Sequence, residues 1–342
     1  MTPKNFVARA PVRVDPAGGG TDAPPFSIEH GGAVVNFGIT HYIYAHLEVA
    51  DKTRDVIIHS DDFDTEVRAA SLDALQPEGD LALLIAIARR MNPPWGFRLR
   101  IASDVRPGSG LGSSGALGVA CVGVFDAAMG AKRTPQETAE LANAIERKDL
   151  GLAGGSQDSY GAAFGGINLI TYKKGGGTSH RPLNVPQSAF HELERRCVLV
   201  YTGQVHLSGT IHTDIKQSYA LPNSPTVDAL KNLARVAQQS ASALESGHVD
   251  RFGELLNDNW THHKRLHESC DSPTLKTFYD AASDHIIGGK TCGAGGGGCV
   301  LFLAKDGHRR ALERTCTDLG GALLPFRIAP QGLHTWPLPP TT

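Results

Sequence analysis

Three glycine-rich segments interrupt the chain, and the middle one constrains its fold most. It reads PGSGLGSSG at residues 107–115 and continues directly into ALGVACVGVF at residues 116–125, an apolar run of small residues. Such a run is typical of a buried helix, and glycines let backbone N–H groups approach an anion without a Cβ in the way. The sequence therefore predicts a loop that presents a phosphate group to a helix N-terminus, as nucleotide-binding loops do.

Composition narrows the range of partners. The chain has 342 residues and a formal net charge of −2, so it lacks the basic character that nucleic acid or an anionic membrane surface requires. Its first residues contain no apolar stretch of signal-peptide length, and no run reaches the roughly 18 apolar residues of a membrane span. Six cysteines without paired spacing favour reduced thiols. We therefore expect a cytoplasmic protein with a small-molecule ligand, and no nucleic-acid or membrane partner.

Hydrophobic patterning predicts an α+β fold, because strands and helices alternate without a strict βαβ rhythm. The expected strands cover residues 33–39, 42–49, 96–102, 197–201 and 299–304, and the expected helices cover residues 116–125, 135–147, 227–244, 252–266 and 273–282. Thr134 and Pro135 are typical of an N-cap and a first helical position. Residues 173–179 predict a flexible connector, which places a domain boundary near residue 180.

Three patterns resemble functional motifs without satisfying them. GxGxxG at residues 110–115 has the dinucleotide spacing but lacks the acidic residue about 20 positions on, so a NAD-dependent dehydrogenase is a weak alternative. GKT at residues 289–291 ends like a Walker A loop, but its glycines follow the lysine. His263 and His267 have the spacing of one helical turn, as two metal ligands could, but the sequence offers no third ligand nearby. We therefore expect His262, His263 and His267 to lie on a solvated helix face.

Taken together, the three glycine-rich segments resemble the GHMP kinases, the small-molecule kinases named for galactose, homoserine, mevalonate and phosphomevalonate. The middle segment is similar to their phosphate loop, APVRVD with AGGGTD at residues 10–22 to their first motif, and GAGGGG at residues 293–298 to their third. The resemblance covers nearly the whole chain and implies an ATP-dependent and Mg²⁺-dependent kinase. It also implies a domain like ribosomal protein S5 domain 2 over residues 1–180, a ferredoxin-like domain over residues 181–342, and a homodimer.

Phosphoryl transfer needs a cradle for the nucleotide phosphates, a divalent cation and an oriented acceptor hydroxyl. The cradle is expected from the backbone of Pro107, Gly108, Ser109, Gly110, Leu111, Gly112, Ser113, Ser114 and Gly115. Ser113 or Ser114 is placed to contact Mg²⁺, and the resemblance assigns Glu146 as the carboxylate ligand of that ion. By position alone, Glu146 also fits a solvated residue on a helix surface.

Asp158 lies in a segment with few charges, so we expect its carboxylate to be buried and paired. This residue type also fits a helix N-cap. The resemblance assigns Asp158 as the catalytic base that accepts the proton of the acceptor hydroxyl, and Arg13 as the cation beside it. Because a carboxylate is a far weaker base than a sugar alkoxide, we expect positioning and charge stabilisation to contribute more than proton abstraction.

The acceptor is expected to bind at the first and third glycine-rich segments. The substrate-binding candidates are Gly18, Gly19, Gly20, Thr21, Asp22, Gly295 and Gly296. Asp22 can accept hydrogen bonds from sugar hydroxyls, although a tight turn and a tight strand entry are alternative roles for the two segments. A phosphate on the acceptor would call for Lys or Arg, and the sequence leaves Lys173, Lys174, Lys264 and Arg265 open.

Within the superfamily, residues 17–26 and 157–168 look most like kinases of D-glycero-D-manno-heptose 7-phosphate. This implies phosphorylation of the anomeric hydroxyl to give the 1,7-bisphosphate. Ser156 and Ser159 stand where lysine and glutamine are usual, which keeps a fucose or galactose kinase as an alternative. A catalytically silent sugar and nucleotide sensor is a further alternative, disfavoured because Arg13, Glu146 and Asp158 are all present.

Overall fold

Two β-sheets organise the protein, which the computed structural model describes over residues 5–204, 208–222 and 224–339. The strands of the larger sheet are β1 (Asn5–Ala17), β2 (Gly32–Ala50), β3 (Val56–Ser60), β4 (Thr65–Ala69), β5 (Gly96–Ser103), β6 (Ile167–Tyr172), β7 (Thr178–Pro182) and β12 (His334–Leu338). Their order is β12-β1-β2-β5-β3-β4, with β6 pairing β2 and β7 pairing β6. The smaller sheet has the order β11-β8-β10-β9, formed by β8 (Cys197–Tyr201), β9 (Ile286–Thr291), β10 (Cys299–Ala304) and β11 (Ala322–Leu323).

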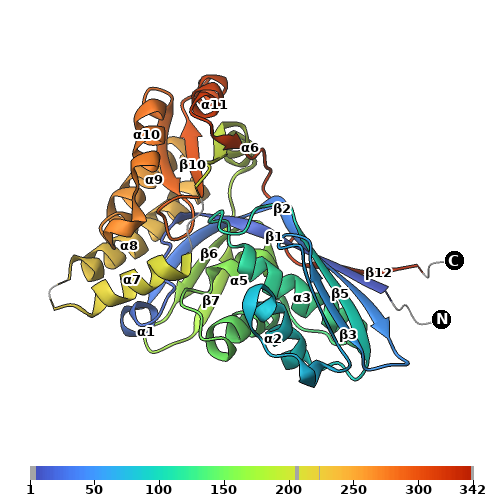
Figure 1. Cartoon of the computed structure of the whole chain (residues 1–342). Coiled ribbons are helices and arrows are strands. Elements are labelled where there is room, and N and C mark those ends of the chain that lie inside the picture. The colour runs from blue at the N-terminus through green and yellow to red at the C-terminus, as the bar shows by residue number, and fades with distance from the viewer. Residues whose placement is uncertain (1–4, 205–207, 223, 340–342) are drawn as a thin grey trace.

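The helices gather around these sheets in two groups (Figure 1). Those nearest the larger sheet are α1 (Phe26–His30), α2 (Ala82–Met91), α3 (Ser113–Met129), α4 (Pro135–Ala144) and α5 (Gln157–Phe164). The later ones are α6 (Gln187–Arg196), α7 (Ser208–Ala220), α8 (Pro225–Glu245), α9 (Val249–His263), α10 (Pro273–Ala282) and α11 (Arg309–Asp318). Single turns lie at η1 (Leu72–Ala74), η2 (Gly79–Leu81), η3 (Ile145–Asp149) and η4 (Glu268–Cys270). Helix α8 packs on β2 and α9 on β9, so these two helices join the sheets.

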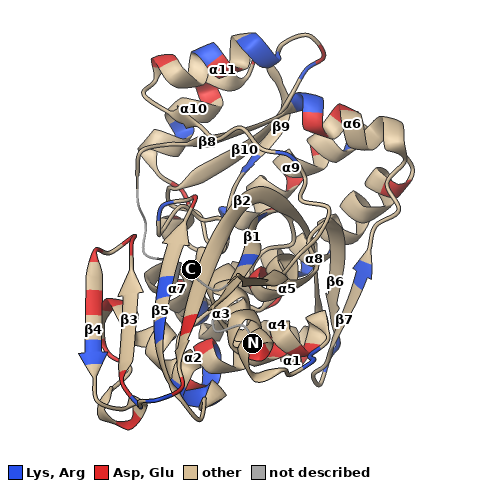
Figure 2. Ribbon diagram, turned by 90° about the vertical axis from the view of Figure 1, so that its right-hand side faces the viewer, with Lys and Arg blue, Asp and Glu red and all other residues tan. Residues whose placement is uncertain are grey.

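Strand β5 shows the alternation that its sequence predicts. Phe97, Leu99 and Ile101 are buried, whereas Arg98 and Arg100 between them are exposed. Figure 2 shows β5 with blue, basic segments along it. One face of this part of the sheet is therefore apolar and the other solvated. The two strands expected at residues 33–39 and 42–49 are one continuous strand, β2, because no turn-forming residue separates them.

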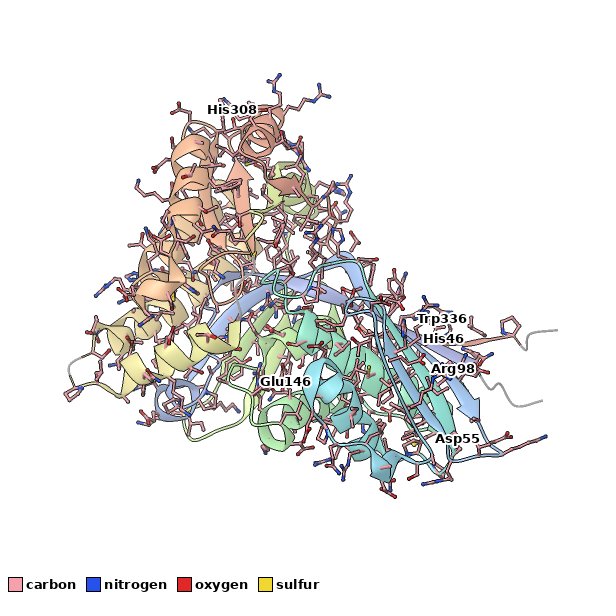
Figure 3. All side chains as sticks on the ribbon, in the orientation of Figure 1. His46, Asp55, Arg98, Glu146, His308 and Trp336 are labelled. Atoms are coloured by element: carbon pink, nitrogen blue, oxygen red, sulfur yellow. The ribbon has the colours of Figure 1, made fainter. Side chains whose placement is uncertain are left out.

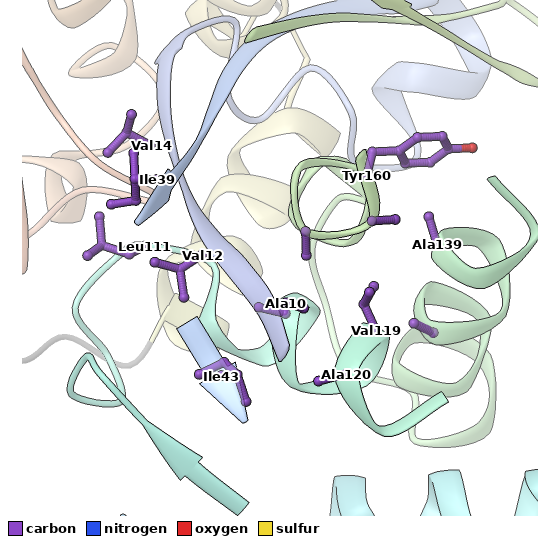
Figure 4. Packing of buried hydrophobic residues seen from close by; sticks show 14 of the residues in the cluster. Ala10, Val12, Val14, Ile39, Ile43, Leu111, Val119, Ala120, Ala139 and Tyr160 are labelled. Atoms are coloured by element: carbon purple, nitrogen blue, oxygen red, sulfur yellow. The ribbon is translucent and has the colours of Figure 1, made fainter. Parts of the chain in front are cut away.

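Helix α3 forms the centre of the core, as its small apolar residues predict. It packs against β1, β2, α4 and α5. Figure 4 shows Val119 and Ala120 of α3 near Ala10 and Val12 of β1, with Ala139 of α4 beyond them. Because this helix is buried over most of its circumference, it holds the loop at its N-terminus firmly in place.

The helix expected over residues 135–147 ends earlier than its sequence pattern suggests. Thr134 and Glu137 form a capping box at its start, with Pro135 in the first position. The α-helical pattern stops at Ala144 and continues as one π-type turn, η3. Such turns occur frequently at functional sites, and this one carries Glu146.

Residues 173–177, expected to be part of a connector, form the turn of a hairpin between β6 and β7. Strand β12, near the C-terminus, pairs with β1 of the larger sheet. The division into domains at residue 180 stays a prediction. All six cysteines are free, as expected, and all six are buried. Within the described ranges, no helix has the length and apolar character to cross a membrane.

Candidate active site

The loop at residues 107–115 leads into the first turn of α3. Gly112 precedes Ser113 with a φ of +70°, a left-handed conformation that glycine adopts without strain. A Cβ at Gly112 would lie 3.1 Å from Arg13 Cζ and from Asp158 Cγ, so only a glycine lets the loop approach these two side chains so closely. Ser113 is half-buried and Ser114 is exposed, beside the free N–H groups of the helix. The loop thus brings an anion-binding helix N-terminus next to Arg13 and Asp158.

The third glycine-rich segment packs against this loop. Cys299 N donates to the Ser109 carbonyl at 2.8 Å, and a Cβ at Gly298 would lie 2.6 Å from the same oxygen. A Cβ at Gly110 would likewise lie 2.6 Å from the carbonyl oxygen of Cys292. The smaller sheet, which carries β9 and β10, therefore supports the phosphate loop from behind.

Arg13 and Asp158 form an ion pair at the end of this loop. Arg13 Nε donates to Asp158 Oδ1 at 2.8 Å, and Nη2 lies 2.6 Å from the same oxygen. Arg13 Nη1 donates to the Gly110 carbonyl at 2.6 Å, which ties the guanidinium to the loop. The Arg13 side chain is 4% exposed and that of Asp158 is 19% exposed. Asp158 therefore presents an accessible carboxylate edge while Arg13 fixes its orientation.

A second buried ion pair lies directly behind the first, and sequence reasoning missed it. Lys290 Nζ donates to Asp15 Oδ2 at 2.6 Å, and both side chains are fully buried. Asp15 Oδ1 accepts from the Gly293 backbone N–H at 2.8 Å and lies 3.7 Å from Arg13 Nη1. Burial alone would raise the pKa of Asp15, but Lys290 and Arg13 hold it below its ordinary value. Lys290 belongs to the GKT pattern at residues 289–291, which is not a Walker A loop, and no local pattern pairs it with a residue 275 positions away.

These four residues form a row of alternating charge: Lys290, Asp15, Arg13 and Asp158. Burial disfavours the charged guanidinium, yet Asp158 and Asp15 raise the pKa of Arg13 above its usual value. Arg13 is therefore a permanent cation. The row is neutral overall, so a phosphoryl group next to Arg13 meets a fixed positive charge that is already compensated from behind.

A narrow cavity of about 30 Å³, which we call the neck, opens beside Arg13 and Asp158. Its other lining residues are Gly20, Asp22, Arg147, Gly155, Gln157, His212, Ile215, His263, Leu266, Gly293 and Ala294. Burial, with Arg147 adding to it, lowers the pKa of His212 to about 4, so this imidazole is neutral at pH 7. The neck therefore combines a carboxylate, a guanidinium and a neutral imidazole within reach of one small group.

Asp22 forms the wall of the neck opposite the phosphate loop. Its Oδ1 accepts from Gly20 N and its Oδ2 from Gln157 N, each at 3.1 Å. A Cβ at Gly155 would lie 1.7 Å from Oδ2, so only glycine leaves room for the carboxylate there. Burial, and after it the nearby charge of Asp158, raises the pKa of Asp22. Hydroxyl donors from a ligand would stabilise this desolvated carboxylate.

The remaining residues of the first glycine-rich segment hold the loop together. Thr21 Oγ1 donates to the Gly18 and Ala33 carbonyls, and Gly18 N donates to Asn259 Oδ1 at 2.9 Å. Gly19 packs against the Asp15 carboxylate. The structure thus places Gly20 and Asp22 at the neck, and Gly18, Gly19 and Thr21 behind them.

A larger cavity of about 630 Å³, the outer cavity, continues from the neck. The two share Gly20, Asp22, Arg147, Gly155, His212 and Ile215. Its walls come from α1 and the loop before it, η3 and residues 151–156, the β6–β7 turn, and α7. A small molecule with one end in the neck would have its other end in the outer cavity.

Glu146 lies in η3, below the larger sheet in Figure 3. It is 5% exposed, and burial raises its pKa, an effect that the nearby Ser114 side chain partly offsets. Arg147 Nη2 lies 3.5 Å away, but this guanidinium also donates to the carbonyls of Leu152, Ala153 and Gly155. A buried, partly compensated carboxylate beside an exposed serine hydroxyl fits Mg²⁺, which takes few carboxylates together with phosphate oxygens and water.

Two expectations differ from the structure. His263 is not on a solvated face: it is 1% exposed, its Nε2 hydrogen-bonds the Ala294 carbonyl at 2.9 Å, and burial lowers its pKa to about 4. Gly295 and Gly296 pack on the backbone of Cys270, while Gly293 and Ala294 line the neck. His262 and His267 are half-buried, and in the described ranges no three acidic, His or Cys side chains cluster as a metal site would require.

Comparisons with known proteins agree with this arrangement. A family profile described as the GHMP kinases N terminal domain matches residues 81–166, and one described as GHMP kinases C terminal matches residues 240–318. The chain is 29% identical over 339 residues to D-glycero-alpha-D-manno-heptose 7-phosphate kinase of Campylobacter jejuni, covering 97% of this chain and 99% of that protein. It is 28% identical to the bifunctional fucokinase/GDP-fucose pyrophosphorylase of Arabidopsis thaliana, covering 90% of this chain and 30% of that protein.

A similar solved structure supports the same family. The crystal structure of a D-glycero-D-manno-heptose 1-phosphate kinase from Bacteroides thetaiotaomicron matches with a TM-score of 0.81 and 27% identity, over 97% of this chain and 99% of that one. The chain belongs to the GHMP kinases and has their two-domain fold. It is an ATP-dependent small-molecule kinase.

Proposed function

We propose that this kinase transfers the γ-phosphoryl group of ATP to the anomeric hydroxyl of D-glycero-D-manno-heptose 7-phosphate, giving the 1,7-bisphosphate. One observation carries the proposal: the Arg13–Asp158 pair joins the phosphate loop, through Gly110 and Gly112, to a neck that opens into a larger cavity. A phosphoryl donor on the loop and an acceptor in the cavity would meet at this pair.

In this reaction the acceptor oxygen forms a bond to the γ-phosphorus while the bond to the β,γ-bridging oxygen breaks. The accessible edge of Asp158 orients the hydroxyl and receives its proton. Arg13 offsets the negative charge on the transferred group, and the row behind it keeps its guanidinium fixed. Because Asp158 is a weak base paired with a cation, its main contribution is positioning.

We assign the nucleotide phosphates to residues 107–115 and to the N-terminus of α3. Glu146 and Ser114, with Ser113 beside them, would hold Mg²⁺. When bound, that ion would offset charge on the nucleotide phosphates. Asp22 and Gly20 would accept and surround the sugar hydroxyls.

The heptose phosphate is favoured over other sugars by two relatives. The Campylobacter jejuni protein named for heptose 7-phosphate matches nearly end to end, and so does the Bacteroides thetaiotaomicron structure named for a heptose phosphate. The fucokinase match keeps an unphosphorylated deoxy sugar as the second candidate. The two differ in one chemical feature, a phosphate at the far end of the acceptor.

The proposal is tested by ATP-dependent turnover across a panel of acceptors: heptose 7-phosphate, unphosphorylated heptose, fucose, galactose and mannose. We expect kcat/KM to be highest for heptose 7-phosphate. Turnover confined to fucose or galactose would keep the kinase and contradict the substrate. Binding of ATP without turnover of any sugar would favour a sensor.

A further inference from the structure

The outer cavity carries a set of lysines that the reaction chemistry does not use. Lys148 comes from η3, Lys173 from the β6–β7 turn and Lys216 from α7. These elements are separated along the chain, and each contributes residues to the lining of this cavity. Three cations therefore converge on one space from three of its walls.

None of these three ammonium groups is paired within the described ranges. Their side chains make no hydrogen bond or ion pair with a described residue, whereas most arginines of the larger sheet and its helices do. Asp22 is the one carboxylate among the described residues that line the outer cavity, and it lies at the neck. Apart from Asp22, the cavity presents Lys148, Lys173, Lys216 and Arg147, so its charge is strongly positive.

We propose that Lys148, Lys173 and Lys216 form an anion subsite for a phosphate monoester at the end of the acceptor remote from the reacting hydroxyl. This inference rests on the proposed function and identifies which residues select a phosphorylated sugar. Lysine is a flexible point charge that suits a terminal phosphate. The neck holds the reacting end near Asp158, so the opposite end of an extended acceptor reaches the outer cavity.

The structure also separates these lysines from other cations in the chain. Of the four candidates that the sequence left open, Lys173 lines the cavity, whereas Lys264 lies over the Trp260 ring at 5.7 Å. Lys174, the neighbour of Lys173 in the same turn, and Arg265 are both exposed and do not line the cavity. Arg147 lines the cavity as well, but it donates to the carbonyls of residues 152, 153 and 155. We therefore treat Arg147 as the support of that loop.

The test compares two acceptors, heptose 7-phosphate and unphosphorylated heptose, for the full-length enzyme and its variants. The double variant Lys148→Ala/Lys216→Ala removes two of the cations, and Lys174→Ala is the matched control. Since each hydrogen bond to a charged phosphate contributes on the order of tenfold in binding, we expect KM for heptose 7-phosphate to rise about 10- to 100-fold in the double variant. We expect kcat, and kcat/KM for unphosphorylated heptose, to stay within about twofold.

Each outcome decides a different point. A wild-type enzyme that does not prefer the phosphorylated sugar overturns both the proposed substrate and the subsite. A wild type that prefers it, with a double variant that keeps the same preference, overturns the subsite alone. A loss that is equal for the two acceptors also overturns it, because general damage would affect both. A KM increase confined to heptose 7-phosphate and absent in Lys174→Ala supports the subsite.

Discussion

The neck and the outer cavity differ in whether their charged side chains are paired. At the neck, Lys290, Asp15, Arg13 and Asp158 alternate in sign at distances from 2.6 to 3.7 Å. In the outer cavity, lysines approach from separate walls without partners among the described residues. The charges at the neck are thus paired before a ligand arrives, whereas the three lysines of the outer cavity have no anionic partner among the described residues and would obtain one from a ligand.

This difference follows from what each region has to do. Charge that develops during phosphoryl transfer is best stabilised by groups that are already oriented and already desolvated, since reorganisation would cost free energy during the reaction. Recognition of a substrate needs only that the bound state be favourable, so flexible lysines on a cavity wall suffice. Variants at the neck should therefore change kcat or folding, and variants or conditions acting on the outer cavity should change KM.

The largest effect is expected from Asp158→Asn. It keeps the shape of the side chain but removes the carboxylate that pairs with Arg13 and that we propose orients the acceptor hydroxyl. We expect kcat to fall by roughly 10²- to 10⁴-fold, the range for loss of a positioned acid–base group, with a small change in KM. Steady-state kinetics measure this. Asp149→Asn, in η3 and paired with Arg90 at 3.2 Å, is the control and should retain activity.

The next effect concerns folding and comes from Lys290→Met. This change leaves the Asp15 carboxylate fully buried, with Arg13 as its remaining cationic partner among the described residues. Removing one partner of a buried ion pair should lower the free energy of unfolding by about 3 to 5 kcal/mol. Urea denaturation measures the loss, and the double variant Asp15→Asn/Lys290→Met should recover part of it. Equal stability of wild type and single variant would show that the row is not held by charge.

The pH dependence of stability should report the neutral histidine in the wall of the neck. The pKa of His263 is lowered from 6.5 to about 4 in the folded chain, so folding favours its neutral form. Its contribution is present above pH 6.5 and is lost as the pH falls toward 4. We expect this residue alone to reduce the free energy of unfolding by up to about 3 kcal/mol over that interval.

His263→Gln tests this assignment, because glutamine keeps an N–H donor for the Ala294 carbonyl and does not titrate. Denaturation of the variant should show a shallower loss of stability between pH 6.5 and 4 than the wild type. The same substitution at the exposed His191 is the control. Identical pH profiles for His263→Gln and wild type would count against a buried neutral imidazole.

Glu146→Gln tests the Mg²⁺ site that we propose at η3. It removes a buried carboxylate near Ser114 while preserving the volume of the side chain. We expect the Mg²⁺ concentration needed for half-maximal activity to rise roughly 10- to 100-fold. Titration of activity with MgCl₂ measures this. Glu140→Gln on the neighbouring helix α4 is a control, and an unchanged Mg²⁺ requirement in Glu146→Gln would remove Glu146 from the metal site.

The smallest effect should come from salt. Raising the salt concentration from about 0.1 M to about 1 M shortens the Debye length from about 10 Å to about 3 Å. Salt should therefore screen the charges of the solvent-exposed lysines of the outer cavity, but not those of the buried row of Lys290, Asp15, Arg13 and Asp158. We expect KM for heptose 7-phosphate to rise by roughly three- to tenfold with kcat nearly constant. A matching rise in KM for unphosphorylated heptose would show that salt acts elsewhere.

The sequence predicted the parts of this protein that are local. The phosphate loop, α3, β5, β8 and β10 follow from glycine spacing and from patterns of apolar residues. Helix α10 begins and ends at the expected residues. The family resemblance supplied Arg13, Asp158, Asp22 and Glu146, which the structure brings to one place.

The parts it missed depend on contacts between distant segments. Lys290 meets Asp15 only because β9 of the smaller sheet lies behind β1. His263 is buried because the third glycine-rich segment covers it, which no pattern within α9 reveals. The continuous β2 and the π turn after α4 reflect packing that overrides local preference. The three lysines of the outer cavity carry no shared motif at all.

We propose that the phosphoryl group is placed on the anomeric oxygen of a sugar that already bears a phosphate at its other end. The decisive measurement is ³¹P NMR of the product formed from ATP and heptose 7-phosphate. We expect two phosphate signals of equal intensity, with the new one coupled to the anomeric proton. A new phosphate coupled to any other proton, or release of inorganic phosphate without a sugar product, would contradict it.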